Sequence, residues 1–159
     1  IQQLAVASSS PPCIERYWVE AINDQKSPNN PLPPEYGSTY HDDGNMPVQS
    51  TVIYSWMVEQ ELNGVGMSFF ADSPVGSVEG VAPPTECFVE YKSSNGSWTA
   101  IRKSIGYSTQ VTTHPKTTTF DVIKTKGLRA TLWAPTNGTW TAGVGIKEWI
   151  VYSTTKAVV

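Results

Sequence analysis

The chain has 159 residues, of which 39% are hydrophobic and 16% charged, and its formal net charge is -3 at pH 7. That size fits one globular domain with a continuous core. Because the eleven Lys and Arg residues are scattered, the composition excludes the basic surface that nucleic acids and anionic membranes require. No apolar run reaches the roughly 18 residues of a membrane span.

The chain begins with IQQLAVASSSPP, which lacks the basic and apolar regions of an intact secretion signal. The Ser- and Pro-rich end of this segment predicts a tail or linker over 1–12, followed by a single domain over 13–159. Frequent Ser and Thr, twelve Gly, twelve Pro and glycosylation sequons at Asn95 and Asn137 are typical of an extracellular protein.

From 22 to 50 the sequence is proline-rich and predicts a long loop. Short runs of β-branched and aromatic residues follow, broken by turn residues, and they predict strands at 51–58, 64–70, 86–92, 98–103, 117–123, 127–133 and 144–152. The dipeptide Asn95-Gly96 is typical of a hairpin turn. Since no 3.6-residue apolar stripe is long enough for a substantial helix, we predict an all-β sandwich or jelly roll.

Motifs for catalysis are missing from the sequence. Two histidines, His41 and His114, are too few for a histidine-based metal cluster, and the serine-hydrolase, phosphate-loop and dinucleotide fingerprints are absent. A carboxylate pair for glycoside hydrolysis remains an alternative; its candidates are Asp42, Asp43, Asp72, Glu79, Glu86 and Glu148. Acids in Pro- and Gly-rich loops are more often turn residues, so a free-standing enzyme is the weaker hypothesis.

Aromatic residues make up 11% of the chain, and several lie in predicted loops: Tyr36, Tyr40, Tyr107 and Trp140. Sugars pack their C–H faces on aromatic rings and place their hydroxyls on carboxylates, amides and imidazoles. Rings and polar groups in the same loops therefore favour a carbohydrate site. The tryptophans in or beside predicted strands are expected in the core: Trp56, Trp98, Trp133 and Trp149.

The run TAGVGIKEWIVY at 141–152 places a carboxylate in an apolar stripe. With a strict two-residue period, Glu148 shares one face with Val144, Ile146, Ile150 and Tyr152. Burying an unpaired charge costs several kcal/mol, so Glu148 needs a cationic partner.

Cys13 and Cys87 are the only cysteines. A disulfide between positions so far apart would stabilise the domain by about 4 kcal/mol in the loop-entropy model. We predict this bridge, with two buried thiols as the alternative.

Four segments carry a family resemblance. TTTFDVIKTKGLRATLW and the following WTAGVGIKEWIVY resemble the end of galactose-binding-like, discoidin-type β-sandwich modules. CFVEYKSSNGSWTAI is similar to the hairpin of that family, and WVEAINDQKSP to its early turn. The resemblance implies a galactose-binding-like β-sandwich (jelly roll) that binds carbohydrate without catalysis. It also implies attachment to a secreted glycoside hydrolase that acts on galactose- or arabinose-containing polysaccharide.

The resemblance further implies a structural Ca²⁺ ion that ties the early turn to the last strand. The matching residues are Asp24 and Glu148, and Asn23 and Ser27 would add oxygen ligands, which suits a hard cation. Pairing of Glu148 with a Lys or Arg is the alternative.

Two stretches depart from the family's pattern. AGVGIKEW carries two extra residues, Val144 and Gly145, which predicts a bulge or longer loop before Glu148. FFADSPVGSVEGVAPP is longer than the matching loop, so the sugar specificity does not carry over.

In such modules the loops at one end of the sandwich hold the ligand, and the corresponding segments here are 36–47, 71–83, 105–116 and 134–141. We expect Trp140 or Tyr40 as the platform for a galactose-type ring. The hydrogen-bonding candidates are His41, Asp72, Glu79 and Asn137. Arg129 lies mid-strand and is predicted to be a structural pair or a surface charge.

Other functions stay open on the sequence alone. The chain could be a structural sandwich domain of a larger glycosidase without a sugar site, or an adhesion module that recognises protein or lipid. We expect a monomer whose partner is an oligo- or polysaccharide, with no nucleic-acid or membrane partner.

Overall fold

The computed structural model describes residues 4–13, 18–23, 37–38, 46–72, 80–101, 107–112, 114–139 and 141–154. Over these residues the chain is built from strands and one 3-10 helical turn, so the all-β prediction is confirmed. The elements in chain order are β1 (Val6–Ser10), η2 (Val19–Asn23), β2 (Gly37–Ser38), β3 (Gln49–Phe70), β4 (Val81–Ala82), β5 (Glu86–Lys92), β6 (Trp98–Ala100), β7 (Lys116–Trp133) and β8 (Gly143–Ser153).

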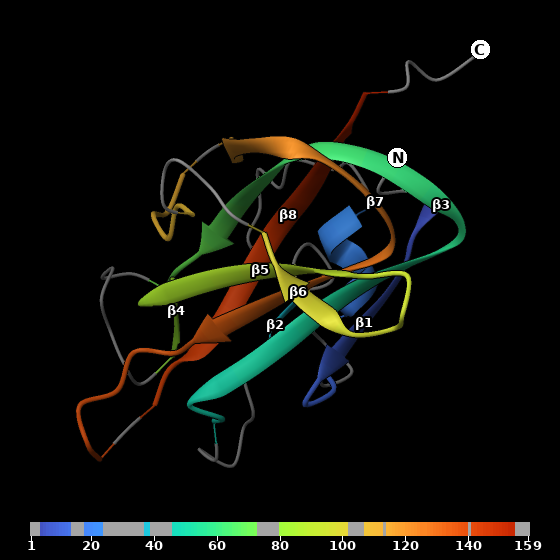
Figure 1. Cartoon of the computed structure of the whole chain (residues 1–159). Helices are drawn as coiled ribbons and strands as arrows, with labels where there is room; N and C mark the ends of the chain where they lie inside the picture. The colour runs from blue at the N-terminus through green and yellow to red at the C-terminus, as the bar shows by residue number, and fades with distance from the viewer. Residues whose placement is uncertain are drawn as a thin grey trace.

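Two long strands, β3 and β7, run through both layers of the sandwich. Figure 1 shows them as curved ribbons that turn back on themselves. In one layer the strand order is β1, first half of β3, second half of β7, β5 and β6. In the other layer the first half of β7, the second half of β3, β8 and β2 lie side by side. The predicted separate strands at 51–58 and 64–70 are therefore one strand, and so are those at 117–123 and 127–133.

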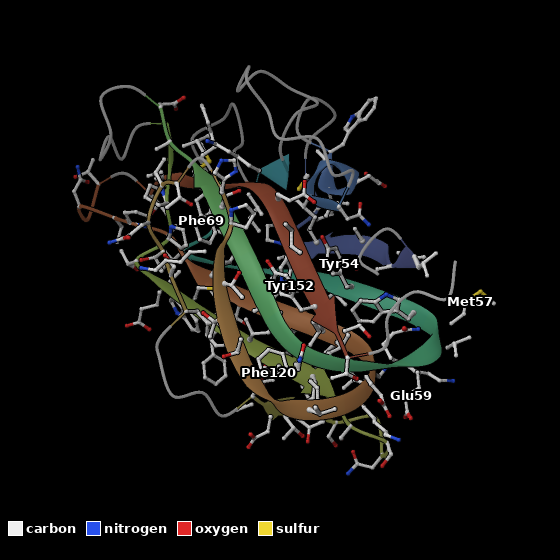
Figure 2. All side chains as sticks on the ribbon, turned by 90° about the horizontal axis from the view of Figure 1, so that it is seen from above. Tyr54, Met57, Glu59, Phe69, Phe120 and Tyr152 are labelled. Atoms are coloured by element: carbon white, nitrogen blue, oxygen red, sulfur yellow. The ribbon has the colours of Figure 1, made fainter. Side chains whose placement is uncertain are left out.

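The bend of β3 lies between Ser55 and Gln60, where the pairing with β7 shifts register. Met57 at this bend is 94% exposed and points away from the molecule (Figure 2). Backbone hydrogen bonds between β3 and β7 are present on both sides of the shift, so β3 passes from one layer to the other without a loop. We call this part of the molecule the bent end.

The core lies between the two layers and is closed by an aromatic contact across them. Tyr54 of β3 stacks on Trp149 of β8 with ring centroids 4.3 Å apart, and both side chains are fully buried. Trp56 packs edge-on against Tyr54 and is also buried. Core positions are thus confirmed for Trp56 and Trp149, whereas Trp98 and Trp133 are half-buried.

A bulge in β8 resolves the apolar stripe around Glu148. Phe69 of β3 pairs with Ile146 and Ser68 pairs with Glu148, so Lys147 is an extra residue in β8. The bulge was predicted, but its effect on the faces was not. Before the bulge, Val144 and Ile146 face the core. After the bulge, Trp149 and Val151 occupy that same face, and Glu148 points away from it. The strict two-residue period was wrong here because one inserted residue exchanges the faces.

Two further predictions are corrected. Residues 6–10 of the predicted tail form β1, which pairs with β3 from Val6↔Ser55 to Ser10↔Thr51. Cys13 and Cys87 are thiols and not a disulfide. The reason is their placement: Cys13 lies at the end of β1 with its Sγ 3.4 Å from Ser9 Oγ, whereas Cys87 is buried in β5 with its Sγ 3.7 Å from Met67 Sδ.

Candidate functional site

Described residues of three predicted binding loops, 36–47, 71–83 and 134–141, lie at one end of the sandwich. At this end β3 begins and β7 ends, since Gln49 pairs with Trp133, and β5 begins beside the same Trp133. The end of β3 lies beside the start of β8, where Phe70 pairs with Gly145. We call this end the rim; its described segments are 46–48, 71–72, 80–85 and 134–139 with 141–142.

Backbone hydrogen bonds join the rim segments to one another. Ala134 N donates to Val48 O at 2.8 Å, and Thr85 N donates to Trp133 O at 2.8 Å. Gly143 N donates to Gly80 O, also at 2.8 Å. Segments far apart in the sequence therefore form one connected surface at the rim.

Asp72 closes the base of the 72–81 segment. Its backbone N–H donates to Val81 O at 2.8 Å, and its Oδ2 accepts from Val81 N at 2.7 Å. A Cβ on Gly80 would collide with the Asp72 carboxylate, so this clasp requires glycine at position 80. Val81 in turn pairs with Gly143 at the start of β8. Asp72 thus lies on the rim, but one of its carboxylate oxygens is engaged in holding the backbone.

Asn137 lies in the exposed hairpin that follows β7. Thr136 and Thr141 form an isolated antiparallel bridge at its base, and Gly138 adopts a φ of 90°. Asn137 Oδ1 accepts from Thr139 N at 3.0 Å. The side chain is exposed on the rim and also stabilises its own turn.

The structure places two of the six predicted sugar ligands on the rim. Asp72 and Asn137 both lie on segments of the rim. The other four lie outside the described residues: Tyr40, His41, Glu79 and Trp140.

Tyr107, one of the loop aromatics, is packed against the core. Its burial raises the pKa of the phenol, and the nearby Cys87 thiol adds to that rise. The hollow beside it has an empty volume of ≈ 180 Å³ and is lined in part by Met67 and Lys116. Tyr107 is therefore a half-buried residue that packs against the core.

Arg129 is a structural pair, as predicted. Its Nη2 lies 2.6 Å and its Nε 2.8 Å from Glu90 Oε2, across the paired strands β7 and β5. Its guanidinium also lies 4.7 Å from the ring centroid of Trp98. This ring, on the outer face of the sheet, covers Gly127, whose Cβ position is 3.4 Å from the Trp98 ring. Trp98 was expected in the core, but it lies on the outer face of the sheet. The prediction was wrong because a position in a strand does not by itself tell the inner face from the outer one.

The candidate calcium site centres on the buried carboxylate of Glu148. Glu148 is 6% exposed, lies on the face of β8 away from the core, and pairs with Ser68, which is 2% exposed. Among the residues that the structure describes, no three His, Cys, Asp or Glu side chains gather into a metal cluster. Further ligands would therefore come from the turn that follows Asn23, where Asp24 and Ser27 lie outside the described residues.

The described residues place η2, which directly precedes that turn, beside β8. η2 lies against β8, β1 and β2. Tyr54 Oη lies 2.9 Å from Ile22 O of η2 and 3.0 Å from Trp149 O of β8, so one buried hydroxyl holds the two elements together. Ile22 directly precedes Asn23, and Trp149 directly follows Glu148. Sequence reasoning missed Tyr54, and no local pattern distinguishes it from an ordinary core tyrosine.

Asn23 ends η2 with its amide turned toward β1. Its Nδ2 donates to Ala5 O at 3.2 Å, and its amide oxygen is the atom that a cation would use. A buried carboxylate, a side-chain amide and the carbonyls of a turn are the hard oxygen donors that Ca²⁺ prefers. Among the described residues, the buried carboxylate of Glu148 is an oxygen donor of the kind that a calcium ion takes.

No helix among the described residues is long and apolar enough to cross a membrane. No protein-family model matches the chain, and no curated protein matches it.

Solved structures do match. One, described with the multiple functions of the Streptococcus pneumoniae β-galactosidase BgaA, is 15% identical with a TM-score of 0.71 and covers 96% of this chain and 98% of its own. The family 32 carbohydrate-binding module of Clostridium perfringens NanJ, in complex with galactose, is 14% identical with a TM-score of 0.69 and covers 96% of both chains. A putative α-L-fucosidase from Bacteroides thetaiotaomicron is 14% identical with a TM-score of 0.64, and the match covers 96% of this chain and 28% of that one. These likenesses confirm the predicted galactose-binding-like β-sandwich.

Proposed function

We propose that this chain is a non-catalytic carbohydrate-binding module that recognises a galactose- or arabinose-containing polysaccharide through its rim. The observation that supports the proposal is that described residues of three predicted binding segments meet at one end of a galactose-binding-like sandwich. A module of the same fold, that of NanJ, was solved with galactose bound. The polar rim residues Asp72 and Asn137 supply hydrogen-bonding groups, and Trp140 or Tyr40 supplies the ring on which a sugar packs.

The module acts by targeting an attached enzyme. A likeness that covers 28% of a putative α-L-fucosidase supports a place beside a catalytic domain in an extracellular glycosidase. A site on a rim contacts only a few sugar units, so its own affinity is modest. Linkage to an enzyme raises the effective affinity for a polymer with many copies of the same unit.

A structural calcium ion belongs to the same proposal. Glu148 and Asp24 hold it, with Asn23 and Ser27 as further oxygen ligands, and it fastens the early turn to β8. The support is the buried carboxylate of Glu148 beside η2, at the point where Tyr54 joins both elements. The ion is structural, since a cage closed by protein oxygens leaves no position for a reacting group.

Native gel electrophoresis in soluble polysaccharides tests sugar binding directly. The isolated chain is expected to be retarded by galactan or arabinan, and either Trp140→Ala or Tyr40→Ala, whichever removes the ring platform, is expected to abolish the retardation. Phe88→Ala is the matched control, because Phe88 is 41% exposed on β5, outside the rim segments, and its loss is expected to leave the retardation intact. Normal mobility of the parent chain in galactan, arabinan and xylan would favour a structural domain without a sugar site. Turnover of aryl glycosides by the isolated chain would contradict a non-catalytic module.

A further inference from the structure

The two sequons each contain an Asn-Gly dipeptide in an exposed turn of nearly the same shape. Gly96 has a φ of 87° and Gly138 a φ of 90°. In both turns the Asn Oδ1 accepts from the backbone N–H two residues later, at 2.9 Å from Ser97 N and at 3.0 Å from Thr139 N. Differences in chemical behaviour between the two must therefore come from the other hydrogen bonds of each turn.

An Asn-Gly pair is prone to deamidation because glycine has no Cβ to obstruct the reaction. The glycine backbone nitrogen attacks Cγ of the asparagine, the Cγ–Nδ2 bond breaks, and ammonia leaves with the proton that the glycine nitrogen loses. Water then opens the resulting five-membered imide at either carbonyl, which gives aspartate or isoaspartate. The attack requires the glycine N–H to leave its hydrogen bond and the asparagine side chain to turn toward it.

The turn between β5 and β6 holds both reacting groups. Gly96 N donates to the backbone carbonyl of Ser93 at 2.9 Å. Asn95 Oδ1 lies 2.6 Å from Ser93 Oγ in addition to its bond from Ser97 N. Ser93 N donates to Ser97 O at 2.9 Å, which continues the strand pairing into the turn. Attack at Asn95 thus has to break several bonds of a closed hairpin.

The turn after β7 holds the attacking nitrogen less firmly. Gly138 N donates to a side-chain hydroxyl, Thr136 Oγ1, at 3.2 Å. Thr136 and Thr141 form an isolated bridge and no continuous ladder, and their hydroxyls lie 3.3 Å apart. Residues 136–139 are exposed. A long bond to a hydroxyl on an exposed turn opens more readily than a bond to a backbone carbonyl inside a hairpin.

We propose that Asn137 is a site of spontaneous deamidation on the rim and that Asn95 is the protected counterpart. The reaction adds one negative charge to the rim. At a candidate sugar contact, a carboxylate then replaces the amide of Asn137. An effect of this change on sugar binding rests on the proposed function, whereas the modification itself does not.

Peptide mapping by mass spectrometry after incubation of the folded chain at mildly alkaline pH tests the proposal. The Asn137 peptide is expected to deamidate at least about fivefold faster than the Asn95 peptide, the factor that one hydrogen bond is worth in a rate. The same incubation in denaturant is the control, and there the two peptides are expected to react at similar rates. Equal rates in the folded chain, or a faster reaction at Asn95, would overturn the proposal.

Thr136→Val supplies a second readout on the same chain. It removes the acceptor of the Gly138 N–H, so the Asn137 rate is expected to rise while the Asn95 rate stays unchanged. An unchanged ratio of the two rates would show that this hydrogen bond does not control the reaction and would also overturn the proposal. Neither readout involves a sugar, so the result is independent of whether the rim binds one.

Discussion

The two ends of the sandwich are built in different ways. At the bent end β3 and β7 change layer as continuous strands, and backbone pairing resumes after each register shift. At the rim the strands stop, and short segments are held by individual bonds, such as those between Asp72 and Val81. The bent end therefore contributes to folding, while the rim can vary in sequence without loss of the sheet, as ligand-binding loops do. Changes at the rim should alter sugar binding, and changes elsewhere should alter stability alone.

Calcium removal is the strongest way to break this comparison, because the ion would fasten η2 to β8 between the two ends. At a calcium concentration of 100 times the Kd, linkage contributes about 2.7 kcal/mol. Chelation is then expected to lower the Tm by roughly 5–10 °C for a domain of this size. Differential scanning calorimetry with and without a chelator measures the shift.

Two glutamate variants show whether the calcium response belongs to Glu148. Glu148→Gln is expected to abolish the response to the chelator. Glu86→Gln, an exposed acid on β5, is the control and is expected to retain it. An unchanged Tm on chelation of the parent chain would rule out the ion.

Tyr54→Phe should lower stability without touching the rim. The change removes the buried hydroxyl that lies within hydrogen-bond distance of Ile22 O and Trp149 O, at an expected cost of about 1–3 kcal/mol. Tyr152→Phe is the control, because Tyr152 is 37% exposed and its hydroxyl bonds to Thr117 on the surface. Its cost is expected to be about 0.5 kcal/mol or less. Urea unfolding gives both values, and a Tyr54→Phe chain with weaker sugar binding would contradict the separation.

The rim clasp is tested by a double-mutant cycle between Asp72 and Gly80. Asp72→Ala leaves the Val81 N–H without its carboxylate acceptor and is expected to destabilise by about 1–2 kcal/mol and to weaken sugar binding. Gly80→Ala brings a Cβ onto the Asp72 carboxylate. The alanine at position 80 should therefore cost less in the Asp72→Ala background than in the parent chain. Strictly additive losses in urea midpoints would refute this contact.

The smallest effect is expected at the bent end, from the ion pair between Glu61 of β3 and Lys124 of β7, 2.8 Å apart and exposed. The hydrogen bond and charge of Lys124 lower the pKa of Glu61, and Glu61 raises the pKa of Lys124. Because the pKa of Glu61 is lower in the folded chain, its carboxylate stabilises the fold at pH values above the pKa of the unfolded chain. This stabilisation is lost as the pH falls through the pKa of the folded chain. Because the pKa of Lys124 is higher in the folded chain, its ammonium group stabilises the fold at pH values below the pKa of the unfolded chain. This stabilisation is lost as the pH rises through the pKa of the folded chain.

Lys124→Ala should therefore lower the Tm slightly at neutral pH, where both groups are charged, and leave it nearly unchanged at acidic and alkaline extremes, so that the dependence of the Tm on pH becomes flatter. Thermal unfolding across pH measures this. A large loss at neutral pH would contradict the weak, exposed character of the pair.

Local sequence patterns predicted the strands because each half of a bent strand alternates by itself. They could not predict that 51–58 and 64–70 join, since the mostly polar residues 59–63 between them look like a turn. Residues 6–10 were missed because Ser-rich sequence lacks an apolar stripe, yet backbone pairing with β3 suffices to make β1.

The sequence predicted which residue types the candidate site contains. It could not predict how their side chains are oriented or which groups they contact. Glu148 stood out as an acid in an apolar run, and the structure buries it. Its orientation depended on one extra residue, Lys147, which no period reveals. Asp72 was predicted as a sugar ligand, but its engagement with Val81 depends on a contact across a loop that sequence spacing does not encode.

A titration of the isotope-labelled chain with galactose, followed by backbone amide NMR, tests the central claim most directly. We expect fast-exchange shifts concentrated on the rim, at Asp72, Val81 and 136–139, with amides of the bent end near Met57 unchanged. Shifts confined to the bent end or to the outer sheet face around Trp98, or no shifts with any galactose- or arabinose-containing sugar, would contradict the account.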